Sequence, residues 1–266
     1  MEYAFFIGGD KVAFYDNELN IVNEFIEVLP EEILIFDDNG EILLNSVCDN
    51  NNWINSSGKS DPPPDMYSNK YNLMMDIMRV DDHTSITKKG KMYNPHRIKE
   101  NKTYKEIQQW IAKSDITLTG DNLVNTVTDL PTSEDHSYDK YLNEFSRVVK
   151  KHDESYNLYI ENHPNMKLIY FILDESSPYL RSKEKNIIVK AGNKIRARLH
   201  LFFYDSSFIN VLKESKADYV IWYAPFKHFD SLEKVELPKV IMYTKDNLNK
   251  MECIKYNQSE MYSIEE

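Results

Sequence analysis

The stretch from Asp135 to Asn162 constrains the fold most, because it carries the longest regular hydrophobic pattern in the sequence. Its apolar side chains recur at steps of three and four residues, which places them on one face of a long amphipathic helix. Thr132 and Asp135 resemble a capping box at its start, and Pro164 ends it. We therefore expect a long helix that flanks the core. The residues of this face are Tyr141, Leu142, Phe145, Val148, Val149, His152, Tyr156, Tyr159 and Ile160.

Short apolar or β-branched runs before and after this helix predict strands. The Asn39-Gly40 pair, between Ile33–Phe36 and Glu41–Leu44, favours a hairpin turn. Helical spacing recurs over 97–114 and over Ser207–Ser215. The expected class is α/β, with α+β as the alternative: a mixed sheet flanked by the long helix, with an N-terminal β-hairpin unit. The other expected strands are Tyr3–Ile7, Val12–Tyr15, Tyr71–Val80, Leu168–Leu173, Asn186–Lys190, Leu199–Tyr204, Tyr219–Tyr223 and Val240–Tyr243.

A polar segment with a Pro-Pro-Pro run, residues 48–69, can propagate neither a helix nor a central strand. It predicts an N-terminal β-rich unit at 1–65, either separate or part of the same domain, followed by an α/β main domain at 66–246. Residues 247–266 are polar and acidic without periodicity, which predicts a flexible tail.

Composition excludes several classes of protein. The 266-residue chain has a net charge of −11, which disfavours general coating of nucleic acid. No apolar run approaches the ~20 residues of a membrane span, and the first residues lack a signal-peptide pattern, so we expect a cytoplasmic protein. The two cysteines belong to no zinc spacing, and phosphate-loop, dinucleotide-binding and nucleophile-elbow motifs are missing from the sequence.

Acidic side chains follow three of the expected strands. If these strands are parallel, their carboxyl ends meet at one crevice, where carboxylates need a compensating cation such as Mg²⁺ or Mn²⁺. The alternative is structural: Asp205 before Ser206 suits a helix N-cap, and the others solubilise loops. The candidate metal ligands are Asp82, beside Asp81, and Asp174, Glu175 and Asp205.

A basic strip at 181–198 carries a local charge of +6, which leaves −17 on the remainder of the chain. Such a strip beside acidic strand ends could hold the phosphates of a nucleic acid. The alternative is a solvated hairpin whose lysines face water, which is the more common meaning of an exposed charge run. Its candidate phosphate-binding residues are Arg181, Lys183, Lys185, Lys190, Lys194, Arg196 and Arg198.

Two further side chains are candidates for catalysis. Lys227 lies near the end of the aromatic run Tyr219–His228, where a lysine near a scissile phosphate would stabilise developing charge, although such rings more often serve packing. His83 beside Asp82 could act as a ligand or a base. His152 lies on the apolar face of the helix, which predicts a core residue. His136 lies in the first turn of the same helix.

The order of elements over 135–223, a long helix, three strands, a helix and a strand, is similar to the core of the restriction-endonuclease-like fold. That resemblance implies a helix carboxylate such as Glu144, an aspartate on the second core strand and an acid-x-lysine on the third, together holding a divalent metal. The sequence departs from this pattern, because Asn186–Lys190 offers no aspartate and Leu199–Tyr204 no acid-x-lysine.

Two hypotheses about function follow. The first is a nuclease or phosphodiesterase that depends on Mg²⁺ or Mn²⁺ and acts in conflict between phage and bacterium, binding nucleic acid through 181–198. The second is a non-enzymatic acidic binding protein, such as an immunity, inhibitor or anti-defence factor, that occludes a basic protein partner. The sequence indicates no membrane contact and no oligomeric state.

Overall fold

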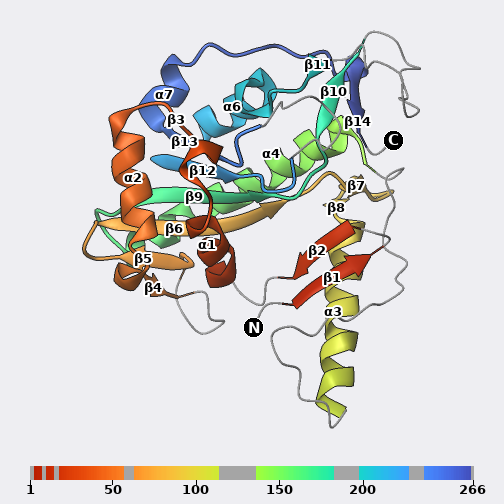
Figure 1. Cartoon of the computed structure of the whole chain (residues 1–266), viewed down its shortest axis with the longest axis horizontal. Coiled ribbons are helices and arrows are strands. Elements are labelled where there is room, and N and C mark those ends of the chain that lie inside the picture. The colour runs from red at the N-terminus through yellow and green to blue at the C-terminus, as the bar shows by residue number, and fades with distance from the viewer. Residues whose placement is uncertain are drawn as a thin grey trace.

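The computed structural model describes residues 3–7, 10–14, 18–56, 63–113, 136–182, 198–227 and 237–264. Within this part of the chain it shows an α/β protein built on a mixed sheet of seven strands (Figure 1). In spatial order the strands are β3 (Ile33–Ile35), β13 (Val240–Thr244), β12 (Tyr219–Tyr223), β9 (Lys167–Asp174), β6 (Leu73–Val80), β5 (Met66–Ser68) and β4 (Ile54–Asn55). The three central strands, β12, β9 and β6, are parallel to one another, and so are β3 and β13. The other neighbouring pairs are antiparallel.

Helices cover both faces of the sheet, because side chains alternate between the faces along each buried strand. On β9, Leu168, Tyr170 and Ile172 pack toward α4 (Tyr138–Glu154) and α6 (Ser206–Glu214). Their neighbours Ile169, Phe171 and Leu173 pack toward the opposite layer. That layer contains α1 (Glu18–Ile26) and α2 (Asp38–Cys48), and the remaining helices are α3 (Pro95–Lys113), α5 (Tyr156–Asn162) and α7 (Lys245–Lys250).

Three small sheets lie outside the large one. The strand expected at Tyr3–Ile7 is present as β1 (Tyr3–Ile7), and it pairs antiparallel with β2 (Asp10–Phe14), which overlaps the strand expected at Val12–Tyr15. A second hairpin follows β6. Its strands are β7 (Ser85–Ile86) and β8 (Met92–Tyr93). The third small sheet has three strands, which are in spatial order β11 (Arg198–Leu199), β10 (Tyr179–Arg181) and β14 (Met261–Ser263).

The long amphipathic helix is present, but as two helices. The Ser137 hydroxyl accepts a hydrogen bond from Lys140 N at 3.2 Å and caps α4, whereas the expected cap Thr132 lies outside the described residues. The chain leaves α-helical pairing at Ser155, whose N–H donates to His152 O at 3.0 Å, and α5 begins directly afterwards. Most of the apolar face that the sequence predicts is buried. Tyr141, Phe145, Val148, Val149 and Tyr159 are buried, and the remaining side chains of this face are partly buried.

The hairpin expected around Asn39-Gly40 is wrong, because this segment starts α2. The Asp37 carboxylate accepts a hydrogen bond from Gly40 N at 2.9 Å and caps the helix. A Cβ on Gly40 would lie 2.5 Å from Ile35 Cγ2, so the glycine serves a close approach of helix to strand and not a turn.

The strand expected at Leu199–Tyr204 is also largely wrong: only β11 is extended, and a 3-10 helix occupies Phe202–Tyr204, where Phe202 and Phe203 enter the core. The expected strand Asn186–Lys190 lies outside the described residues. Of the strands whose order resembles the restriction-endonuclease-like core, the first is β9 in the large sheet, whereas β11, the extended part of the third, lies in another sheet.

Residues 247–264 pack onto the core instead of forming a loose tail. Leu248, Tyr256 and Met261 are buried, and β14 pairs with β10. At the other end of the chain, β3 and β4 extend the large sheet, so strands on both sides of the predicted boundary at residue 65 belong to one sheet. The domain division itself stays a prediction.

Phe208 provides a test of the packing between α6 and the α4 face. It is fully buried, with ring centroids 4.5 Å from Tyr141 and 5.1 Å from Phe145. We expect Phe208→Ala to lower the free energy of unfolding by about 3–5 kcal/mol through lost burial and the cavity left behind. Urea denaturation measures this loss. The control Leu158→Ala, at a side chain 46% exposed, should change stability by less than about 0.5 kcal/mol, and an equal loss there would contradict the assignment.

Candidate metal centre

The parallel pairing of β6 and β9 brings polar residues from distant parts of the sequence to one edge of the sheet. Val80 is opposite Asp174 in the register, so Asp81, Asp82 and His83 leave β6 where Glu175 and Ser176 leave β9. The backbone fixes this junction, because Glu175 N donates to Val80 O at 2.8 Å. The expectation that parallel strands deliver acidic side chains together is thus confirmed for these two strands.

Within the described part of the chain, Asp82, His83 and His136 form a group that could hold a metal ion, which we call the Asp82 group. One ligand atom from each side chain lies within 4.8 Å of the others, and all three residues are buried. Asp82 Oδ1 lies 3.1 Å from His136 Nδ1 and 3.9 Å from His83 Nε2. One carboxylate and two imidazoles are a ligand set found at transition-metal sites in proteins.

Neighbouring groups orient the Asp82 carboxylate. Its second oxygen, Oδ2, accepts hydrogen bonds from Ser177 N at 3.1 Å and from the Tyr179 hydroxyl at 2.8 Å. The Ser177 hydroxyl lies 2.8 Å from His136 Nδ1, so the loop after β9 contacts two of the three candidate ligands. Such outer contacts fix the direction of ligand lone pairs before any ion binds.

The electrostatics keep two of these side chains in the protonation states that metal binding requires. Burial acts to raise the pKa of Asp82, but the hydrogen bond and charge of His136 outweigh it and hold the pKa at about 2. Burial lowers the pKa of His83 to about 3 despite the opposing charge of Asp82. At neutral pH the carboxylate is ionised and the His83 imidazole neutral, so neither side chain has to lose a proton to bind a cation.

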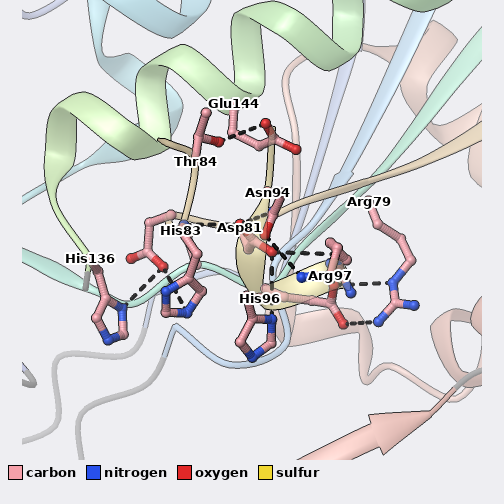
Figure 2. Close-up of polar contacts among 12 residues, drawn as sticks. Arg79, Asp81, His83, Thr84, Asn94, His96, Arg97, His136 and Glu144 are labelled. Carbon is pink, nitrogen blue, oxygen red and sulfur yellow. Dashed lines mark hydrogen bonds and ion pairs between the residues drawn. The ribbon is translucent and has the colours of Figure 1, made fainter. Parts of the chain in front are cut away.

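A third histidine continues the cluster. Figure 2 shows the rings of His136, His83 and His96 in a row, with ring centroids 4.4 Å apart in each neighbouring pair. His83 Nδ1 is buried and has no hydrogen-bond partner among the described residues. A buried polar atom left in this way is unusual in a folded protein, and a ligand to the imidazole would satisfy it.

Asp81 turns away from its neighbour Asp82 and contacts α3 instead. It accepts hydrogen bonds from Asn94 Nδ2 at 2.7 Å and from His83 N at 3.0 Å, and Arg97 Nε lies 3.4 Å from its Oδ2 (Figure 2). Burial raises the pKa of Asp81 against the opposing charge of Arg97. This aspartate therefore holds the start of α3 next to the Asp82 group.

Asp174 lies outside the group that could bind a metal, because other side chains surround it. Its carboxylate accepts hydrogen bonds from the Tyr141 hydroxyl, from Trp222 Nε1 at 2.8 Å and from the Ser176 hydroxyl at 2.6 Å. Lys227 Nζ lies 3.6 Å from it. These contacts place Asp174 in a buried polar network. Its role as a metal ligand stays a prediction.

Lys227 belongs to the same network. Its ammonium donates to the Ser176 hydroxyl at 2.6 Å and to Ser177 O at 3.2 Å, and it lies over the Tyr141 ring. Only 4% of the residue is exposed. The structure therefore places this predicted electrostatic catalyst where it holds the loop after β9, away from solvent.

Glu175 and Asp205 are likewise engaged elsewhere. Glu175 forms ion pairs with Arg79 and Arg97, whose guanidinium charges overcome burial and hold its pKa at about 2. Asp205 caps α6 through Ser207 N at 2.8 Å and accepts from the Tyr138 hydroxyl at 2.5 Å. The structural alternative for Asp205, an N-cap, is the one that the geometry supports.

The basic strip is mostly outside the described residues, which include none of Lys183, Lys185, Lys190, Lys194 and Arg196. Of its ends, Arg181 forms an ion pair with Glu260 at 2.8 Å, and Arg198 is exposed on β11. Its binding of phosphate stays a prediction.

Sequence reasoning missed His136 as a ligand, although it named Asp82 and His83. His136 is 53 residues from His83 in sequence, and no short spacing connects them. Glu144, which the fold resemblance suggested as a ligand, accepts hydrogen bonds from Thr84 and Arg147 instead. His96, three residues after the hairpin that follows β6, carried no signal in the sequence.

Comparisons with protein families, with characterised proteins and with solved structures find no match to this chain. Among the described residues, no helix has both the length and the apolar character needed to cross a membrane. The arguments about function below therefore depend on the geometry of the chain itself.

The network around Asp174 predicts that substitution of this residue lowers the stability of the fold but leaves metal binding unchanged. We expect Asp174→Ala to lower the free energy of unfolding by about 3–5 kcal/mol, because it leaves the Lys227 ammonium buried without its partner. Adding Lys227→Met should recover part of this loss. Urea denaturation measures both, with exposed Asp246→Ala as the control. Unchanged stability, or loss of Mn²⁺ binding in a variant that stays folded, would contradict the structural role.

The low pKa of His83 predicts how the metal-free protein responds to acid. Its folded pKa of about 3 lies below the ordinary 6.5, so its contribution to stability is complete above pH 6.5 and is lost as pH falls toward 3. Over this window His83 should contribute a slope of about 1.4 kcal/mol per pH unit, one proton taken up on unfolding. Urea denaturation from pH 7 to 4 measures the slope, which should become shallower in His83→Gln. An identical slope in both proteins would refute this.

Proposed function

We propose that the chain is a divalent-metal-dependent hydrolase that acts on phosphodiesters, with Asp82, His83 and His136 as the metal ligands. The observation that supports this is the buried Asp/His/His group, in which a carboxylate and two imidazoles converge. Three protein ligands leave coordination positions for water and substrate, which is typical of catalytic and not of purely structural sites.

The ligand chemistry favours Mn²⁺ over Mg²⁺ among the two ions that the sequence suggests. Mg²⁺ prefers oxygen ligands and keeps several waters, whereas two of the three groups here are imidazoles. Zn²⁺ and Fe²⁺ suit the same set, so they belong in any binding test. When bound, such an ion polarises a phosphoryl oxygen and lowers the pKa of a coordinated water.

The residues of the chain have separate tasks in this proposal. Ser177 and Tyr179 orient Asp82, and burial keeps His83 neutral. His96, stacked on His83 and half-buried at the margin of the cluster, lies where a substrate would approach. The choice of nucleic acid as substrate depends on the strip at 181–198, and the role in conflict between phage and bacterium depends on composition alone.

A non-enzymatic protein that binds a basic partner is the second candidate. It is supported by the contacts that three of the four predicted ligands, Asp174, Glu175 and Asp205, make with tyrosine or arginine side chains. In this case the Asp82 group would hold a metal for stability only.

Metal titration combined with a hydrolysis assay tests the proposal. We expect Mn²⁺ to bind the wild type with one site by calorimetry and to support cleavage of bis-p-nitrophenyl phosphate, plasmid or single-stranded DNA. Asp82→Asn and His136→Gln should each weaken Mn²⁺ binding by about 100-fold and abolish cleavage, because each removes a ligand.

The control is His163→Gln, a histidine that contacts Tyr67 outside the cluster and should bind Mn²⁺ like the wild type. Unchanged Mn²⁺ affinity in Asp82→Asn would overturn the site. Binding without cleavage of any of these substrates would overturn the enzymatic role and favour the second candidate.

A further inference from the structure

A pocket of about 510 Å³ opens beside β6, separate from the Asp82 group. It exists because β5 is short: Met66–Ser68 pairs only with the first part of β6, at Leu73–Met75. Beyond Met75, β5 no longer pairs with β6, and Ile77 N donates instead to the Asp65 carboxylate at 2.8 Å. Side chains from helices line the space there. The pocket is therefore lined from both faces of the sheet, by Ile21 of α1 and Val148 of α4 among others. Its volume is in the range of small-molecule sites.

Cationic side chains from three elements line this pocket. Arg79 comes from β6, Arg97 from α3, and Arg147 and Lys151 from α4. Glu175, a partly buried acid, fixes the guanidinium groups of Arg79 and Arg97 through ion pairs. The Glu144 carboxylate accepts hydrogen bonds from Nε and Nη2 of Arg147 and fixes that side chain in the same way. Arginines held in this way lose little side-chain entropy when a ligand binds.

The acidic side chains of the pocket already have partners. Both oxygens of Glu144 are bonded to Arg147, and Thr84 donates to one of them at 2.6 Å. Asp76 Oδ2 accepts from the Tyr159 hydroxyl at 2.6 Å and contacts His152. Asp65 accepts the backbone bond from Ile77. Bound carboxylates of this kind offer few acceptor positions to a cationic ligand.

Arg147 and Lys151 leave donors for a ligand. They are four residues apart on one face of α4, where two like charges repel by about 0.2–0.5 kcal/mol. Within the described residues the contacts of Arg147 use two of its five N–H groups, both toward Glu144. Lys151 is exposed and has no ion pair in the same part of the chain. An anion between the two groups would relieve the repulsion and accept these hydrogen bonds.

We propose that this pocket binds a phosphate-bearing small molecule, with its phosphate between Arg147 and Lys151. The site goes beyond the proposed hydrolase, because it uses none of the metal ligands. Two contacts link it to them: Thr84 follows His83 and donates to Glu144, and Arg97 lies between Glu175 and Asp81. A phosphate fits the planar guanidinium fork better than a simple halide does.

Calorimetric titration of metal-depleted protein with inorganic pyrophosphate tests the site. We expect saturable binding to the wild type, weakened about tenfold or more in Lys151→Met through the loss of one charged contact. Arg147→Lys keeps the charge but loses the fork, and it should also weaken binding. The matched control is Lys150→Met, an exposed lysine of α4 that does not line the pocket and should leave affinity within twofold.

Each outcome decides the proposal. Absence of binding to the wild type, or equal weakening in Lys150→Met, would overturn the site, and equal affinity for succinate would overturn the assignment to phosphate. Asp82→Asn should bind pyrophosphate like the wild type. Because no divalent metal is present, failure of this titration leaves the proposed hydrolase untouched, and failure of the metal titration leaves the pocket untouched.

Discussion

The parallel register of β6 and β9 is the constraint on which the candidate metal centre depends. Eight residue pairs, from Leu73–Lys167 to Val80–Asp174, fix the ends of the two strands against each other. One strand end supplies Asp82 and His83, and the other supplies Ser177, which orients Asp82. A shift of one residue would turn Asp82 and Asp174 to opposite faces of the sheet, because side chains alternate along a strand. The apolar alternation that builds the two cores therefore also positions the polar group at the sheet edge.

Four of the five buried aspartates among the described residues share one physical solution, an aromatic hydroxyl or ring N–H as hydrogen-bond partner. Asp82 is bonded by Tyr179, Asp174 by Tyr141 and Trp222, Asp205 by Tyr138, and Asp76 by Tyr159. Burial, together with the adjacent carboxylate charge, raises the pKa of Tyr138, Tyr141 and Tyr159, so these phenols remain donors. A carboxylate accepting such bonds can stay ionised inside the core without a metal. Asp82 differs from the other three because two imidazoles flank it.

Sequence patterns predicted the elements that contain an apolar run or a regular apolar periodicity and missed those decided by a single capping or packing contact. Strands β6 and β9 follow from apolar runs, and the apolar face of α4 follows from helical periodicity. The turn expected at Asn39-Gly40 failed because an N-cap at Asp37 and the close approach to Ile35 outweighed a two-residue turn preference. For the site, strand-end reasoning found Asp82 and His83, but it assigned the same role to Asp174 and Asp205. Only side-chain geometry distinguishes a carboxylate surrounded by donors from one beside two histidines, and only the fold brings His136 there.

Crystallography with anomalous scattering from bound Mn²⁺ or Zn²⁺ tests the central claim most directly. Crystals grown with either ion should show one strong anomalous peak coordinated by Asp82, His83 and His136, at metal–ligand separations of about 2.0–2.2 Å. Ordered metal at Asp174, Glu175 or Asp205, or an empty Asp82 group at saturating metal concentration, would contradict the account.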